Sequence, residues 1–246
     1  MDRSDLARPE RPRHIAVIMD GNGRWARARS RPRAFGHREG VEAVRRTVQA
    51  AGELGVEWLT LFGFSTENWE RPAEEVSDLL DLLRRFVDAD LERLHVEGVR
   101  VRIAGRREGL SADLTEIITR AESRTADNDR FHLTIAFNYG GRDEIARAAR
   151  RLAERVQAGE IGPAAIDEHM FATALDVPEA PEVDLLIRTS GEKRISNFLL
   201  YQAAYAEFVF TDVLWPDFNR AALEAALAEY RARERRFGRV ATADAS

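Results

Sequence analysis

Six short apolar runs, rich in β-branched and aromatic residues, alternate along the chain with longer amphipathic stretches. This alternation constrains the fold more than any other feature of the sequence. A strand, a helix and a second parallel strand form a right-handed crossover, and repeated crossovers build a largely parallel sheet covered on both faces. We therefore expect an α/β fold with a largely parallel six-stranded sheet flanked by helices.

The expected elements can be placed along the chain. The strands are predicted at residues 14–19, 57–64, 99–104, 131–137, 184–187 and 207–211. The helices are predicted at residues 39–54, 72–97, 112–126, 142–157 and 221–237. No linker or internal repeat interrupts the pattern, so we expect one catalytic domain over residues 13–238. Flexible tails are expected at residues 1–12 and 239–246.

Composition excludes several classes of protein. With 246 residues, 44% of them hydrophobic, the chain can bury a sizeable core. It has no cysteine, so disulfides, thiolate metal sites and cysteine nucleophiles are excluded. No apolar run approaches the ~20 residues of a membrane-spanning helix, and the first residues lack the apolar region of a signal peptide. We expect a soluble, cytoplasmic protein.

The charge of the chain argues against a nucleic-acid binder. The formal net charge is −5, and the helix predicted at residues 72–97 is acidic, so a continuous basic face is not expected. Residues 1–46 nevertheless hold twelve arginines against six acids. Only Lys193 among the basic residues is a lysine, a bias typical of GC-rich coding. Single arginines therefore count only where their position adds information.

Polar residues gather where four of the predicted strands end. The segments are DGNGRW (20–25), STENWER (65–71), NYGGR (138–142) and RTSGEKRISN (188–197). Ligands of open parallel sheets bind beyond the carboxyl ends of the strands. We expect these segments to form one site, because a scaffold without a ligand would use shorter turns here.

The first of these segments favours an anion site that contains a carboxylate. Gly21 and Gly23 flank Asn22, so the backbone can turn tightly and point N–H groups at a phosphate. The basic residues that follow are Arg24, Arg33 and His37. Asp20 beside an anion is unfavourable unless a cation lies between them, and Mg²⁺ is the natural one. Taken alone, the segment also fits an ordinary turn that caps a helix.

A second set of anion-binding residues follows the fifth predicted strand. It consists of Arg188, Arg194 and Ser196, and Arg71 could serve either set. Two sets indicate two phosphate-bearing groups. Surface arginines remain an alternative for any one of them, but agreement among several strand ends favours the functional interpretation.

Three further side chains follow strand ends. Asn68 could orient a substrate or relay a proton, although an amide is a poor base. Trp25 and Trp69 could form an apolar wall for a hydrocarbon or could pack under a loop. No motif of a metalloprotease, a serine hydrolase or a P-loop protein occurs in the sequence.

At this level of detail the chain resembles the cis-prenyltransferases, which make Z-prenyl diphosphates, and most closely the bacterial undecaprenyl diphosphate synthases. The resemblance runs from about residue 14 to residue 238. Its motifs are HIAVIMDGNGRWA (14–26), RAFGHREG (33–40), TLFGFSTENWERPAEEV (60–76), FNYGGR (137–142), DLLIRTSGEKRISNFLLYQAAYAEFVFTDVLWPDF (184–218) and RERRFG (233–238). The DDxxD motifs of trans-type synthases do not occur.

The resemblance implies a role for each matching residue. The allylic diphosphate, usually farnesyl diphosphate, would be held by Gly21, Asn22, Gly23, Arg24, Arg33, His37 and Arg71. Isopentenyl diphosphate would be held by Arg188, Arg194 and Ser196, with Ile195 between them. Mg²⁺ would be bound by Asp20 and Glu207. The other substrate-binding residues would be Trp25, Ser65, Thr66, Glu67, Asn68 and Trp69, and Asn68 would also help to remove a proton.

The resemblance further implies a homodimer, in which Arg236 and Gly238 reach the partner's site. It implies a tunnel for the growing chain, with Gly63 near the mouth, Phe131 at the floor and residues 72–97 as one wall. We expect a long product near undecaprenyl diphosphate, a carrier lipid for cell-wall synthesis. The enzyme could then contact a membrane through its lipid product.

Alternatives stay open at this stage. The chain could be a short- or medium-chain synthase, or a non-catalytic subunit of the same fold, although relatives of that kind have lost the metal aspartate. Ser190 stands where many members have glycine, and Tyr201 where many have tryptophan. We expect neither of them to touch the site residues.

Overall fold

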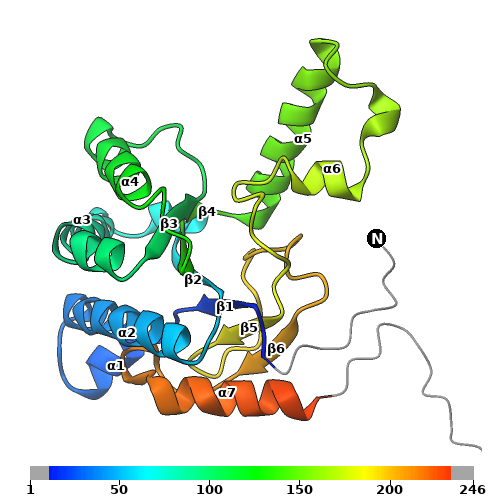
Figure 1. Ribbon diagram of the computed structural model, residues 1–246. Coiled ribbons are helices and arrows are strands. Elements are labelled where there is room, and N and C mark those ends of the chain that lie inside the picture. The colour runs from blue at the N-terminus through cyan, green and yellow to red at the C-terminus, as the bar shows by residue number, and fades with distance from the viewer. Residues whose placement is uncertain (1–10, 234–246) are drawn as a thin grey trace, which may run out of the picture.

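The computed structural model describes residues 11–233, in which six strands form one parallel sheet (Figure 1). The spatial order of the strands is β3-β4-β2-β1-β5-β6, and every neighbouring pair is parallel. The strands are β1 (His14–Ile18), β2 (Trp58–Ser65), β3 (Val99–Ala104), β4 (Phe131–Tyr139), β5 (Leu185–Arg188) and β6 (Glu207–Phe210). The α/β class and the six-stranded parallel sheet predicted from the sequence are thus confirmed.

Helices connect the strands. The α-helices are α1 (Asn22–Ala28), α2 (Arg33–Glu53), α3 (Ala73–Val96), α4 (Ala112–Arg124), α5 (Gly141–Gln157), α6 (Glu168–Ala172) and α7 (Arg220–Ala232). Short 3₁₀ turns are η2 (Thr66–Glu70), η3 (Pro163–Ala165) and η4 (Trp215–Asp217). Within residues 11–233, no helix is long and apolar enough to cross a membrane.

The start of the chain differs from the prediction at one place. Residues 22–28 are helical rather than a loop, and α2 begins at Arg33 instead of residue 39. Gly21 makes this possible, because its φ of 110° turns the chain directly from β1 into α1. In α2, a Cβ on Gly36 would lie 2.1 Å from the carbonyl oxygen of Asn22. The glycines weaken α2 locally but let α1 pack closely against it.

The two faces of the sheet are covered unequally. Ile15 and Val17 of β1 face a large core formed with α2, α3, α4 and α7, whereas Ala16 and Ile18 face a smaller cluster. That smaller cluster is closed by the segment after β5, which contributes Phe198, Leu199 and Ala203. Helix α5 packs on α6 instead, and Figure 1 shows the pair standing away from the other helices.

The predicted tails and the C-terminal motif lie beyond this description. Residues 1–12 and 239–246 fall wholly or almost wholly outside residues 11–233. Arg236, Gly238 and the end of the helix predicted up to residue 237 also lie outside the described residues.

His14 is buried at the start of β1 and connects three segments. Its Nδ1 lies 2.8 Å from the Pro181 carbonyl oxygen and its Nε2 lies 2.7 Å from Thr60 Oγ1. Burial lowers the pKa of this imidazole from 6.5 to about 4, although the hydrogen bond to Pro181 opposes the shift. His14 is therefore neutral at neutral pH.

We predict that His14 makes the free energy of unfolding depend on pH. Between pH 6.5 and about 4 the unfolded chain binds a proton at His14 and the folded chain does not. The free energy of unfolding should therefore fall as the pH is lowered across this range, by about 3 kcal/mol from this residue. Urea unfolding at several pH values should show that His14→Gln flattens the dependence. His169→Gln, at an exposed position, should leave it unchanged; equal slopes for both variants would contradict the assignment.

Candidate active site

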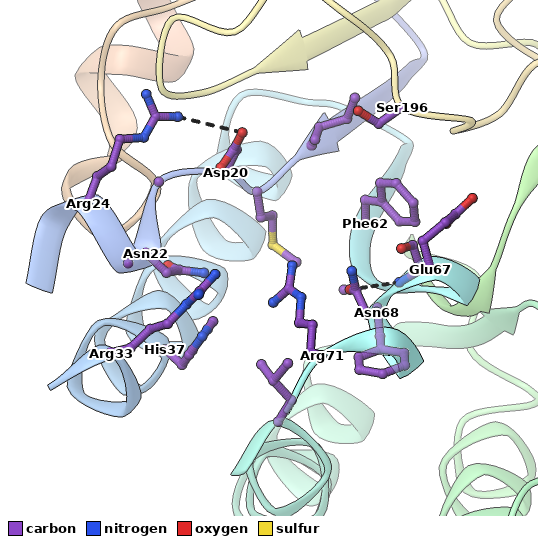
Figure 2. Close-up of a pocket in the computed structure, with 18 of the residues that line it drawn as sticks. Asp20, Asn22, Arg24, Arg33, His37, Phe62, Glu67, Asn68, Arg71 and Ser196 are labelled. Carbon is purple, nitrogen blue, oxygen red and sulfur yellow. Dashed lines mark hydrogen bonds and ion pairs between the residues drawn. The ribbon is translucent and has the colours of Figure 1, made fainter. Parts of the chain in front are cut away.

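A cavity of about 950 Å³ opens where β1, β2 and β5 end (Figure 2). It brings together most of the site residues predicted from the sequence. These are Asp20, Gly21, Asn22, Gly23, Arg24, Arg33, His37, Gly63, Ser65, Glu67, Asn68, Arg71, Arg188, Arg194 and Ser196. The segment after β4 (138–142) contributes no residue to the cavity wall. It contacts the wall through Asn197, whose side chain accepts a hydrogen bond from the Arg142 N–H.

Asp20 and Arg188 form the centre of the site. Arg188 Nη2 donates to Asp20 Oδ2 at 2.9 Å, and Arg24 Nη2 lies 3.7 Å from the same oxygen. Thr189 fixes the backbone, since its hydroxyl donates to the Asp20 carbonyl oxygen at 2.6 Å. Burial alone would raise the pKa of Asp20, but Arg188, Ser190 and Arg24 together lower it. The carboxylate is therefore charged at neutral pH.

The Arg188 guanidinium also holds the loop that follows β5. Its Nη1 donates to the Arg194 carbonyl oxygen at 2.6 Å and to Ser196 Oγ at 2.8 Å. The Arg188 side chain is only 5% exposed, whereas that of Arg194 is 59% exposed. Arg194 rests 2.5 Å from Glu192, which also lies 3.5 Å from Arg24. Arg188 thus shapes this side of the cavity, and Arg194 can meet a ligand.

Glu75 gathers the other set of cations. Its Oε1 lies 2.8 Å from Arg71 Nη1, 3.2 Å from Arg33 Nε and 3.7 Å from His37 Nε2. From the sequence, Arg71 could serve either set, and this carboxylate places it beside Arg33. Figure 2 shows Arg33 and His37 on the opposite side of the pocket from Ser196. Arg33, His37 and Arg71 therefore lie apart from Ser196, whereas Arg24, predicted in the same set as Arg33, contacts Ser190 on the loop after β5.

Two buried polar atoms on this side have no partner within the described residues. They are Asn22 Oδ1 and His37 Nε2, and both residues line the cavity. Burial lowers the pKa of His37 to about 4, although Glu75 opposes the shift. The imidazole is thus neutral at neutral pH. A buried polar atom without a partner is costly, so these atoms suit a polar ligand.

A smaller apolar cavity of about 130 Å³ adjoins the polar one. Both cavities are lined by Met19, Asn22, His37, Phe62, Gly63, Phe64 and Leu79. The apolar cavity continues between the sheet and two helices, along Val44 of α2, Leu83 and Phe86 of α3, and Ile135 of β4. Gly63 lies at a bulge of β2, and a Cβ there would come 3.3 Å from Ile135 Cγ2. An amphiphile with a charged head fits this pair of cavities.

The short helix η2 presents Glu67 and Asn68 to the cavity. Asn68 Oδ1 accepts from the Ser65 backbone N–H at 3.1 Å, which closes the first turn. Glu67 accepts a hydrogen bond from Asn197 Nδ2 at 3.1 Å. Burial would raise the pKa of Glu67, but bonds from its own backbone, Asn197, Ser65 and Thr66 lower it. Both side chains are therefore fixed before any ligand binds.

Some predicted residues do not line the main cavity. Trp25 is buried, and its Nε1 donates to Asp217 at 2.7 Å, so it packs under a loop. Trp69 and Thr66 line a neighbouring cavity of about 370 Å³. Ile195 packs on the smaller core cluster. Phe131 is 5% exposed in the main core and is absent from the walls of both ligand cavities.

Glu207 lies far from Asp20 within the chain. It opposes Leu185, which opposes Ile15, at the amino-terminal edge of the sheet. Asp20 follows Ile15 by five positions toward the other edge, about 16 Å at ~3.3 Å per residue. Glu207 pairs there with Arg233 at 3.0 Å. The expectation that Asp20 and Glu207 share one ion is therefore wrong for a single copy of the chain.

The expectation for Ser190 is also wrong. We expected it to touch no site residue, but its carbonyl oxygen accepts from Arg24 Nη1 at 2.8 Å. Its hydroxyl accepts from Arg24 Nη2 and also hydrogen-bonds Asp20. Ser190 adopts a φ of 79°, a left-handed conformation uncommon for residues other than glycine. Tyr201 does lie away from the cavity, where its hydroxyl donates to the Glu168 carbonyl oxygen.

Sequence reasoning missed several residues of the site. Arg27, Ser30, Arg31 and Asn197 line the cavity. Arg27 and Arg31 were hidden in an arginine-rich segment, and Asn197 directly follows a predicted residue. Glu75 lies within a quoted motif, in the first turn of α3, and it is four residues after Arg71, which precedes that helix.

The side chains of the cavity could bind a metal ion only if a bound substrate supplied further oxygen ligands. Within residues 11–233, no group of three or more histidine or acidic side chains could hold an ion alone. The Asp20 carboxylate faces the cavity with its side chain 32% exposed. Mg²⁺ is commonly bound by one or two carboxylates together with phosphate oxygens and water. Asp20 therefore fits such an ion once a phosphorylated ligand is present.

Charged residues at the carboxyl edge of a parallel sheet and an adjoining apolar cavity suit a phosphorylated ligand with an apolar tail. Comparison with known proteins identifies the family. Residues 18–238 match the family model described as putative undecaprenyl diphosphate synthase. The chain therefore belongs to this family, and it is a cis-prenyltransferase.

Curated relatives cover almost the whole chain. "Isoprenyl transferase 2" of Bradyrhizobium diazoefficiens is 56% identical over 100% of this chain and 95% of its own length. "Isoprenyl transferase" of Caulobacter vibrioides is 58% identical over 94% of this chain and 89% of its own length.

Solved structures share the fold. Lavandulyl diphosphate synthase from Lavandula x intermedia, in complex with dimethylallyl diphosphate, has a TM-score of 0.90 at 37% identity, over 93% of this chain and 99% of its own. A probable undecaprenyl diphosphate synthase from Campylobacter jejuni has a TM-score of 0.77 at 35% identity, over 92% and 98% of the two chains.

We predict that the Ser190 hydroxyl prepares Arg24 for an anion. Ser190→Ala keeps the backbone but removes the hydroxyl that holds the guanidinium beside Asp20. Affinity for inorganic pyrophosphate, measured by calorimetry, should fall about two- to tenfold, the effect of one hydrogen bond. Ser111→Ala removes a hydroxyl that caps α4 and should leave the affinity unchanged. Unaltered binding by Ser190→Ala would show that Arg24 needs no such support.

Proposed function

We propose that the enzyme condenses isopentenyl diphosphate onto an allylic diphosphate with Mg²⁺, forming Z double bonds. Farnesyl diphosphate is the proposed primer, and a long polyprenyl diphosphate such as undecaprenyl diphosphate is the proposed product. The observation that carries this proposal is a pair of cation sets beside an apolar cavity, one gathered by Asp20 and the other by Glu75. One set suits each diphosphate, and the apolar cavity suits the allylic tail.

Each substrate has a proposed place. The allylic diphosphate binds Arg24, Arg33 and Arg71, and one of its oxygens accepts a hydrogen bond from His37 Nε2, which lacks a partner in the protein. Isopentenyl diphosphate binds Arg194 and Ser196 on the loop that Arg188 holds. This arrangement brings the two reacting ends together at η2, which lowers the barrier by fixing their orientation.

The reaction transfers the allylic group by ionisation. The allylic carbon–oxygen bond breaks, the isopentenyl double bond supplies the electron pair of the new carbon–carbon bond, and a proton leaves to the released diphosphate. The arginines stabilise the charge that develops on the departing diphosphate. Mg²⁺, held by Asp20 and phosphate oxygens, supplies further charge neutralisation when bound. Asn68 orients the isopentenyl end from which the proton leaves.

A shorter product is the second candidate. The apolar cavity of about 130 Å³ is close to the ~150 Å³ that accommodates one benzene. A long chain therefore requires the layer between α3 and the sheet to open beyond Phe86 and Ile135. The similarity to lavandulyl diphosphate synthase also favours a short allylic substrate.

The function itself is tested by incorporation of radiolabelled isopentenyl diphosphate with farnesyl diphosphate and Mg²⁺. We predict that Asp20→Asn lowers turnover about 100-fold or more, because the charge that holds the cation is lost. Asparagine is preferable to alanine, since Arg188 is buried and keeps a hydrogen-bond acceptor. Asp113→Asn, in an exposed ion pair with Arg84, is the matched control. Wild-type turnover by Asp20→Asn would overturn the role of Asp20, and no incorporation by the unmodified chain would favour a non-catalytic subunit.

The product length separates the two candidates. If Phe131 is the floor of an opened tunnel, Phe131→Ala should give longer chains than the unmodified enzyme by mass spectrometry. If the cavity seen here already sets the limit, the unmodified enzyme should make a short product, and Phe86→Ala should lengthen it while Phe131→Ala does not. Matched substrate ratios are needed for both comparisons.

We also propose a homodimer, on the resemblance of residues 233–238 to the family's C-terminal motif. Sedimentation of the full chain tests this, and a monomer at micromolar concentration would contradict it.

A further inference from the structure

Asn138 lies at the end of β4, and its side chain joins two loops outside the main cavity. Its Oδ1 accepts from Trp69 Nε1 at 2.8 Å, and its Nδ2 donates to the Arg106 carbonyl oxygen at 2.9 Å. The Arg106 N–H donates to the Asn138 carbonyl oxygen at 3.1 Å. The residue is 6% exposed. It therefore connects η2, which follows β2, to the loop that follows β3.

The chemistry of the two partners fixes the orientation of the amide. An indole N–H only donates and a carbonyl oxygen only accepts, so only one orientation of the Asn138 amide satisfies both. The backbone of Asn138 has a φ of 50°, in the left-handed region that asparagine enters more readily than most residues. Asparagine thus suits this position in both its backbone and its side chain.

Trp69 is held although 41% of it is exposed. Its ring contacts Phe64 edge-on, with centroids 5.0 Å apart, and its N–H is held by Asn138. Trp69 does not line the main cavity, but Glu67, Asn68 and Arg71 beside it do. The indole is therefore the anchor that sets how far η2 reaches over the cavity.

Space lies behind this anchor. The cavity of about 370 Å³ lined by Thr66, Trp69, Arg106 and Asn138 separates η2 from the loop after β3. Without the hydrogen bond to Asn138, η2 would keep the bond between Glu67 and Asn197 but would have room to tilt about it, away from the reacting ends. Within η2 itself, the bond between Ser65 and Asn68 would persist, so the turn would move as a unit.

We infer that Asn138 is a positioning residue, which fixes Trp69 and thereby places Asn68 and Arg71 over the substrates. This inference rests on the proposed function. It predicts that loss of the amide lowers kcat while the KM for isopentenyl diphosphate stays within about twofold, because the hydrogen bonds from Arg188 to Arg194 and Ser196 do not involve Asn138.

The test uses Asn138→Gly, which tolerates the left-handed backbone, and Trp69→Phe, which keeps the ring but loses the N–H. Each should lower kcat about three- to tenfold, as expected for one hydrogen bond. The double variant should be no slower than Asn138→Gly alone, since both changes break the same link. Trp58→Phe is the matched control: Trp58 Nε1 donates to Thr134 at 3.1 Å near the other end of β2, and its loss should leave kcat unchanged.

A second readout does not depend on turnover. The chain has four tryptophans, and Trp69→Phe identifies which indole N–H signal belongs to Trp69 in an NMR spectrum. Asn138→Gly should shift that signal toward the position of a water-exposed indole.

The outcomes separate the inference from the proposed function. Unchanged kcat in Asn138→Gly, an equal loss in Trp58→Phe, or losses that multiply in the double variant would overturn the positioning role. An unmodified chain without activity would instead contradict the proposed function, and the indole signal would still test the contact. If Asn138→Gly fails to fold, Trp69→Phe decides the same question.

Discussion

The active site depends on one buried guanidinium. Arg188 is the last residue of β5, and it reaches the Asp20 carboxylate, the Arg194 carbonyl oxygen and the Ser196 hydroxyl at once. A charge buried this deeply is tolerated only with a paired carboxylate and further hydrogen bonds. The same residue therefore neutralises the first strand end, shapes the loop after β5 and keeps Asp20 ionised. The parallel order of β1 beside β5 makes these contacts possible.

Much of this arrangement could be predicted from the sequence, because it follows from periodicity and from strand ends. Six apolar runs alternating with helices fixed the class of fold, and the polar residues after β1, β2 and β5 converge in one cavity as expected. Local chemistry was less informative where long-range packing decides the outcome. Gly36 and Gly40 made the first turns of α2 look unlike a helix in the sequence. Both glycines pack closely against Asn22 of α1, a contact that the local sequence does not show. The long loop over the second face of the sheet carried no periodic signal.

The roles of single residues were also hard to predict, because long-range packing decides them. Trp25 and Trp69 looked alike in the sequence, yet Trp25 is buried in α1 with its N–H on Asp217, whereas the N–H of Trp69 in η2 is held by Asn138. Ser190 looked like a neutral departure, and only the φ of 79° brings its hydroxyl to Arg24. Glu207 could be assigned a role only by analogy, since its position at the opposite sheet edge depends on strand register. Side-chain partners across distant segments are set by topology, which a local pattern does not contain.

Glu75 affects how tightly the site binds an anion and how fast the anion leaves. Arg33 and Arg71 share this one carboxylate, which offsets one of their two positive charges. An internal counter-ion stabilises the arginines before an anion binds. It therefore lowers their affinity for an incoming polyanion and raises the rate at which the polyanion dissociates. A synthase that must discharge a diphosphate after every bond it forms gains from such a resident competitor. Weaker binding of the anion is exchanged for faster release, and the two arginines still have a counter-ion after the anion leaves.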